Sequence, residues 1–141
     1  MAAINQRRVL LGAFAGFVVW AIWSLVVNVA ILGPLYPAAQ DAGLLLREPR
    51  VPFFIGVWFL ILFFLSEMIA LLYAWVRATL GPGWRTAATV GVFVGFAAGV
   101  PTNLATASWS PLDRVFTVWW TLDLLAGAIL AALVAGWLYR D

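Results

Sequence analysis

Long runs of apolar residues alternate with short polar segments along this chain of 141 residues. Four runs, at about residues 9–32, 52–79, 86–109 and 115–139, are each long enough to cross a bilayer, which takes about 20 residues as a helix. They are too long for the strands of a membrane β-barrel, which need roughly ten residues. The pattern predicts an all-α integral membrane four-helix bundle, with residues 1–141 forming a single transmembrane domain.

Composition narrows the kind of chemistry that such a protein can carry out. Hydrophobic residues make up 65% of the chain and charged residues 10%, against about 45–50% and about 25% in soluble domains. Cysteine and histidine are absent, which removes thiol nucleophiles and the commonest metal and haem ligands. We therefore expect no metal and no cofactor. No clustered basic face exists for nucleic acid, so the lipid bilayer is the expected partner.

The basic residues are all arginine and lie near the ends of the apolar runs. If the N-terminus is cytoplasmic, five arginines lie inside and three outside, which favours both termini inside under the positive-inside rule. Arginine without lysine, together with many alanines and glycines, is typical of a GC-rich bacterial genome. We therefore expect a multi-pass protein of the bacterial inner (cytoplasmic) membrane. The inside set is Arg7, Arg8, Arg77, Arg85 and Arg140, and the outside set is Arg47, Arg50 and Arg114.

The connections between the runs differ in length. Residues 33–51 form an outer loop rich in proline, and two interpretations stay open for it: a short interfacial or re-entrant helix, or an ordered cap outside the membrane. Gly81-Pro82-Gly83 predicts a tight turn, so the second and third helices should be antiparallel neighbours. Within the third run, Pro101 lacks an N–H and clashes with the preceding turn, which predicts a kink or break of the kind that marks binding sites in transporters.

Small residues recur every fourth position in three of the runs. Residues four apart share one face of a helix, where small side chains let another backbone approach closely. Such rows predict close packing within one bundle, and a homodimer seam is the competing interpretation. The rows are Gly91, Gly95 and Gly99 in the third run; Gly127, Ala131 and Ala135 in the fourth; and Gly12 and Gly16 in the first, continuing to Trp20, Ser24 and Asn28.

Four polar side chains lie well inside the apolar runs. Asp123 is about eight residues beyond the start of the fourth run, roughly 12 Å below the outer surface. An acid at the centre of a membrane helix costs about 2.5–3.5 kcal/mol, so it should face the bundle interior or a wet cavity. We predict an outward-facing polar pocket built from Asn28, Asn103 and Asp123, with Glu67 at its floor. The further expected ligand-binding residues are Thr102, Trp20 and Trp119.

A purely structural role for these groups is the alternative interpretation. Interhelical hydrogen bonds inside membranes average about 0.6 kcal/mol and often do no more than hold helices in register. The tryptophans near the ends of the runs, by contrast, are typical of aromatic belts at the membrane interface. These are Trp58, Trp75, Trp84, Trp109 and Trp137.

One stretch of the third run resembles a known family. The sequence Thr102-Asn103-Leu104-Ala105-Thr106, followed by Trp109 and by an aspartate and a glycine four apart at positions 123 and 127, is similar to that of an uncharacterised family of small bacterial four-helix membrane proteins with a T-N-L-A-T-like motif. The resemblance covers about the last third of the chain and the turn that starts at Gly33. It departs at Val100-Pro101, where the family has a polar pair. It implies a fold and a membrane location, but no activity.

Three functions remain open from the sequence. The first is binding or carrying an apolar or amphipathic small molecule, such as a lipid-like ligand, in the outer pocket. The second is a non-catalytic accessory or assembly subunit of a larger membrane complex, which predicts a filled, dry interior. The third is an intramembrane lipid or isoprenoid isomerase or cyclase, in which Glu67 and Asp123 would act as acid and base. No motif assigns catalytic residues, so whether the chain is an enzyme stays open.

Overall fold

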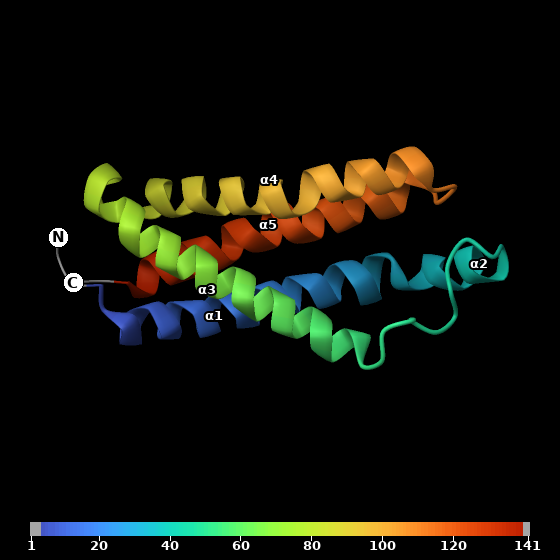
Figure 1. Ribbon diagram of the computed structural model, residues 1–141, viewed down its shortest axis with the longest axis horizontal. Helices are drawn as coiled ribbons and strands as arrows, with labels where there is room; N and C mark the ends of the chain where they lie inside the picture. The colour runs from blue at the N-terminus through green and yellow to red at the C-terminus, as the bar shows by residue number, and fades with distance from the viewer. Residues whose placement is uncertain (1–3, 140–141) are drawn as a thin grey trace.

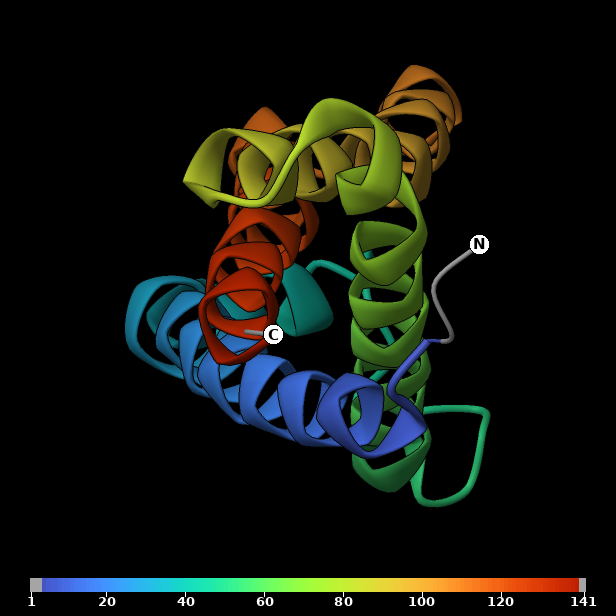
Figure 2. The same ribbon diagram turned by 90° about the vertical axis from the view of Figure 1, so that its left-hand side faces the viewer.

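Four long helices form the body of the molecule. The computed structural model describes residues 4–139, and within them helices are the only regular secondary structure. The long helices are α1 (Gln6–Leu25), α3 (Phe54–Leu80), α4 (Trp84–Trp109) and α5 (Arg114–Leu138). Viewed along the bundle, the tilted helices surround a common centre in the order α1, α3, α4, α5 (Figure 2). Each belongs to a span long and apolar enough to cross a membrane, which confirms the predicted four-helix membrane bundle.

The first membrane span continues after α1 as shorter helices of different types. After α1 the chain runs through the π-helix η1 (Val26–Ile31), the 3-10 helix η2 (Gly33–Leu35) and the short helix α2 (Tyr36–Asp41). Residues 42–53 then return to the start of α3 (Figure 1). The outer segment 33–51 therefore contains a short helix. The start of α1 and the end of α5 lie together at the opposite end of the bundle (Figure 1).

The tight turn between α3 and α4 has the predicted position. Gly81 and Gly83 have φ values of 83° and 138°, which side chains with a Cβ rarely adopt. From this turn the two helices diverge, and α3 crosses α1 so that its start lies on the side of the bundle away from α4 (Figure 1). A cavity remains inside the bundle at the end that carries α2.

The glycine row of α4 packs inside the bundle. An added Cβ at Gly91 would lie 2.7 Å from the Cα of Ile129, and one at Gly95 would lie 2.8 Å from the Cα of Leu125. Both neighbours belong to α5, so the row brings two backbones into contact. Of the two interpretations of this row, close packing within one chain is the one that the contacts support.

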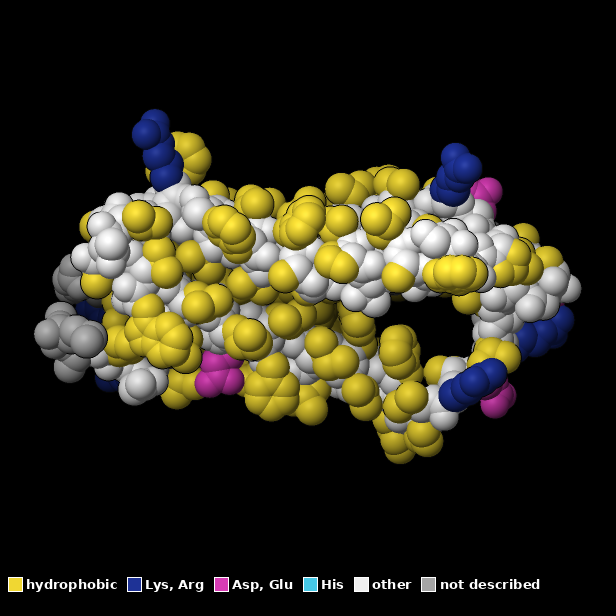
Figure 3. Space-filling model, turned by 45° about the horizontal axis from the view of Figure 1, so that its top comes forward, with side chains coloured by type: hydrophobic (Ala, Val, Ile, Leu, Met, Phe, Trp, Pro, Cys, Tyr) yellow, Lys and Arg dark blue, Asp and Glu magenta, His cyan; other side chains and the backbone are white. Residues whose placement is uncertain are grey.

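Helix α1 approaches α5 in the same way. An added Cβ at Gly12 would meet Ala135 at 3.2 Å, and one at Gly16 would meet Ala131 at 3.0 Å. Small residues on α5 thus serve both neighbours. The rest of the helix surface is apolar along most of its length, with arginines gathered toward the two ends (Figure 3).

Two features of the bundle bear on predictions from the sequence. Helix α4 runs continuously from Trp84 to Trp109 through Pro101, so of the predicted kink or break the break is absent. Trp58 differs from the other expected belt residues, because it is partly buried and its indole N–H donates to Ser24. The other four expected belt residues are exposed: Trp75, Trp84, Trp109 and Trp137.

Candidate ligand-binding cavity

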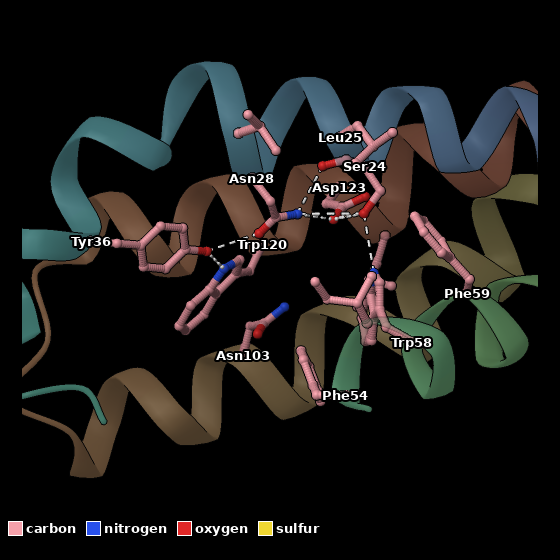
Figure 4. Close-up of a pocket in the computed structure, with 13 residues that line it drawn as sticks. Ser24, Leu25, Asn28, Tyr36, Phe54, Trp58, Phe59, Asn103, Trp120 and Asp123 are labelled. Atoms are coloured by element: carbon pink, nitrogen blue, oxygen red, sulfur yellow. Dashed lines mark hydrogen bonds between the residues drawn. The ribbon is translucent and has the colours of Figure 1, made fainter. Parts of the chain in front are cut away.

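A cavity of about 490 Å³ lies inside the end of the bundle that carries α2. Its volume falls within the roughly 300–1,000 Å³ typical of small-molecule sites. It is open to the outside, as the hollow between α4 and the start of α3 shows (Figure 3). Five of its lining residues are aromatic. The full set is Ser24, Leu25, Asn28, Val29, Tyr36, Phe54, Ile55, Trp58, Phe59, Asn103, Trp120, Asp123 and Leu124 (Figure 4).

Asp123 lies at the inner wall of this cavity. It is on α5, nine residues after Arg114, which corresponds to about 14 Å along a helix. Its side chain is 1% exposed. One carboxylate oxygen, Oδ2, accepts hydrogen bonds from the Ser24 hydroxyl and from the Asn28 amide, both at 2.8 Å. The aspartate is therefore held by two side chains from the first membrane span.

The hydrogen bond from Ser24 has a fixed direction. Trp58 donates its indole N–H to Ser24 Oγ at 3.1 Å. An indole nitrogen can only donate, so Ser24 Oγ must accept there. The single hydrogen of the hydroxyl is then free to point at Asp123 Oδ2. A chain of two donors thus runs from α3 through α1 to the carboxylate on α5.

A second chain of donors reaches the same oxygen from the other side. Trp120 donates its indole N–H to the Tyr36 hydroxyl at 3.2 Å, and Tyr36 donates to Asn28 Oδ1 at 2.9 Å. Accepting at Oδ1 fixes the orientation of the Asn28 amide, whose NH₂ group then faces Asp123. Both chains begin at an indole N–H, which can only donate. Both end at Asp123 Oδ2, which accepts.

Two polar atoms at the cavity have no partner in the protein. Asp123 Oδ1 and Asn103 Nδ2 are buried and make no hydrogen bond. Asn103 extends from α4 toward the cavity, across from Asp123 (Figure 4), and is 9% exposed. An unpaired buried polar group costs about 1–3 kcal/mol. A molecule that paired with both atoms would remove that cost.

The mouth of the cavity is apolar. Four of the lining side chains are also well exposed at the surface: Leu25, Val29, Phe54 and Ile55. They come from the end of α1, the π-helix η1 and the start of α3. The cavity therefore combines a polar inner wall with an apolar entrance, and a molecule with a polar head and an apolar tail matches both.

A π-helix and two tryptophan side chains hold the polar wall in place. Asn28 lies within the π-helix η1, a distortion often found at functional sites. Behind the wall, the Trp20 indole donates to the backbone oxygen of Asp123 at 3.1 Å and packs against Gly127. Trp23 donates to the neighbouring oxygen of Leu122 at 3.2 Å. Two tryptophans of α1 thus fix the stretch of α5 that carries the aspartate.

The predicted site residues fall into three groups. Asn28, Asn103 and Asp123 come together at the cavity as predicted. Trp20 is fully buried behind the wall and acts as a support. Two predictions are wrong. Trp119 packs in an apolar cluster around Phe116, and Thr102 is exposed with its backbone oxygen bonded to Thr106. Each is adjacent in sequence to a residue that does line the cavity. Because one step along a helix turns the side chain by about 100°, neither Trp119 nor Thr102 lines it.

The prediction that Glu67 forms the floor of the pocket is also wrong. Glu67 does not line the cavity, and it is only partly buried. It lies eight residues beyond Phe59, the last lining residue of α3, which is about 12 Å along the helix. Its neighbour Ser66 faces the interior instead. The pairing of Glu67 with Asp123 as acid and base is therefore not available at this site.

Sequence reasoning placed none of the five aromatic lining residues in the predicted site. Trp58 lies close to a predicted helix end, where an interfacial role was the expected one. Tyr36 belongs to the outer segment, which was not expected to reach the pocket. A usable signal existed for it, because Tyr36 follows Asn28 by eight residues and extends the row of Trp20, Ser24 and Asn28.

Comparison with known proteins adds no identification. No family model, no curated protein and no solved structure matches the chain. The resemblance to the family with the T-N-L-A-T-like motif stays a prediction. The cavity and its hydrogen bonds therefore carry the functional argument.

Proposed function

We propose that this multi-pass membrane protein binds an amphipathic small molecule in the cavity at Asp123. The observation that carries the proposal is the pair of buried, unpaired polar atoms, Asp123 Oδ1 and Asn103 Nδ2, at the inner end of a cavity with an apolar mouth. A ligand would place its polar head between these two atoms. Its tail would leave past Val29 and Ile55 toward the surrounding lipid.

The distribution of arginines indicates on which side of the membrane the cavity lies. With both termini inside, as the arginines favour, the cavity lies in the outer half of the bilayer. We propose the inner membrane of a bacterium as the location. A molecule could then enter the cavity from the outer leaflet, because the residues at the mouth are apolar.

The other two functions have less support. An accessory subunit was expected to have a filled interior, and a cavity of about 490 Å³ does not fit that expectation. An isomerase or cyclase would use two carboxyl groups as acid and base, but Glu67 lies outside the cavity and only Asp123 lines it. Ligand binding needs only the groups that line the cavity.

Native mass spectrometry of gently solubilised protein tests the proposal. We expect the wild-type protein to carry a bound small molecule. Val29→Trp, which adds bulk at the mouth, should abolish the adduct. The matched control is Val18→Trp, which adds the same side chain to an exposed position of α1 away from the cavity, and it should keep the adduct. A wild-type protein without an adduct, or an adduct unchanged in Val29→Trp, would contradict the proposal.

A further inference from the structure

The cavity contains one acidic side chain and no basic one. Asp123 is its only acid, and none of its lining residues is an arginine. The chain has no lysine and no histidine. Within residues 4–139, the recorded ion pair joins Arg47 to Asp41 in the outer segment, and Asp123 has no cationic partner. A charge inside a membrane protein is normally paired or faces a functional pathway.

The unpaired oxygen of Asp123 belongs to a side chain that lines the cavity. Its other oxygen, Oδ2, is already saturated by Ser24 and Asn28. Oδ1 is buried without a donor. The described residues thus supply a carboxyl group with one oxygen fixed by two donors and the other without a partner, and they place no positive charge beside it.

Aromatic rings make up much of the remaining wall. Trp58 and Trp120 already use their indole N–H groups in hydrogen bonds to Ser24 and Tyr36, so what they offer a ligand is the face or edge of the ring. Phe54 stacks on Trp58, with ring centroids 6.2 Å apart and an angle of 26° between the planes. Aromatic rings attract organic cations through their π faces, and more strongly where water is excluded.

A metal ion fits these groups poorly. Within the described residues no three side chains of the His, Cys, Asp or Glu type come together. Hard cations require six or more oxygen ligands, and the aromatic wall offers few. An organic cation, by contrast, uses both the single carboxylate and the rings.

We propose that the cavity binds an amphipathic organic cation, whose ammonium group lies between Asp123 and Asn103 against the ring of Trp58. This inference rests on the proposed function and names the chemical class of its ligand. The ammonium N–H groups donate to Asp123 Oδ1 and to the amide oxygen of Asn103, which a half-turn of that amide presents to the cavity. The alkyl portion passes Phe54 and Ile55 to the lipid.

Two probes of the same length separate charge from shape. Dodecylamine, whose head is –NH₃⁺ at neutral pH, and 1-dodecanol, whose head is –OH, differ in charge but little in size. Each would be titrated by calorimetry into the full-length protein in lipid nanodiscs, with empty nanodiscs as the background. We expect the amine to bind at least about tenfold more tightly than the alcohol.

Variants then assign the preference to a residue. Asp123→Asn keeps an acceptor oxygen for Ser24 and Asn28 but removes the charge, so the preference for the amine should fall to about threefold or less. Glu67→Gln removes an acid outside the cavity and should leave the preference unchanged. Circular dichroism checks that both variants fold, and if Asp123→Asn does not, the wild-type comparison alone decides.

The possible results separate this inference from the proposed function. Equal binding of the two probes to the wild-type protein, or a preference that persists in Asp123→Asn, overturns the cationic ligand while amphipath binding stands. Absence of binding by either probe above the empty nanodiscs overturns both.

Discussion

The indole ring of Trp20 occupies the space beside Gly127 that any side chain at position 127 would need. An added Cβ there would collide with Nε1 and Cδ1 of the ring. The same indole nitrogen donates to the backbone oxygen of Asp123. A glycine on α5 therefore lets a tryptophan of α1 hold the segment that carries the buried acid.

Gly127→Ala should destabilise the bundle by about 1–3 kcal/mol, because the fully buried indole must move out of a well-packed position. The free energy of unfolding in mixed micelles, obtained by titration with dodecyl sulfate, measures this. The matched control is Gly56→Ala in α3, where an added Cβ has no neighbour within 4 Å. That variant should be unchanged or slightly more stable, since alanine is the better helix former. Equal effects of the two substitutions would contradict the packing described for Trp20.

Gly95→Leu should destabilise the folded chain without changing the number of chains in the particle. Position 95 is in contact with the backbone of Leu125 on α5, so a large side chain would force α4 and α5 apart. Unfolding titrations report the stability, and light scattering in detergent reports the mass. A loss of mass with no loss of stability would mean that the glycine row forms a seam between two chains.

Replacing each of two buried serines, Ser24 and Ser66, with alanine should have different effects on the free energy of unfolding. Ser24→Ala removes a donor from Asp123 and leaves the Trp58 N–H without its acceptor, which should lower the free energy of unfolding by about 1–3 kcal/mol. Ser66 is equally buried but its hydroxyl has no partner. Ser66→Ala should therefore leave stability unchanged or raise it. Both variants are compared with the wild type in the same unfolding titration, and a larger loss for Ser66→Ala would contradict the network.

Tyr36→Phe should weaken ligand binding by interrupting one of the two donor chains. Without the hydroxyl, Asn28 loses a donor and Trp120 loses its acceptor, and the Asn28 amide is no longer fixed. We expect dodecylamine to bind about three- to tenfold more weakly. Tyr73→Phe is the control, because its hydroxyl accepts from Gly83 N at the far end of the bundle. Equal losses of affinity would show that the effect does not pass through Asn28.

The apolar pattern alone was enough to predict the fold. Long runs of apolar residues have one stable solution in lipid, which is a helix that satisfies its own backbone. The glycine rows likewise indicated which faces pack closely, because only small residues allow backbone contact. These features depend on local sequence. The structure confirms the four helices and the turn at Gly81–Gly83, and it places the glycine row of α4 against α5.

The site was harder to predict because it depends on rotation about each helix axis. Asn28, Asn103 and Asp123 were found because polar groups avoid lipid. The expectation that a polar group in a membrane helix lines the cavity fails for Glu67, which is only partly buried and does not line it. Tyr36 reaches the network only because the first span continues through a π-helix and a 3-10 turn into α2. The sequence does not reveal the turn in direction that these irregular segments produce.

A crystal structure of the protein grown from a lipidic mesophase tests the central claim most directly. The account predicts non-protein density in the cavity, with a polar head within hydrogen-bond distance of Asp123 Oδ1 and Asn103, and a tail that leaves past Val29 and Ile55. A cavity closed by side chains, with Asp123 Oδ1 paired to a protein group, would contradict it. So would a cavity that holds ordered water alone.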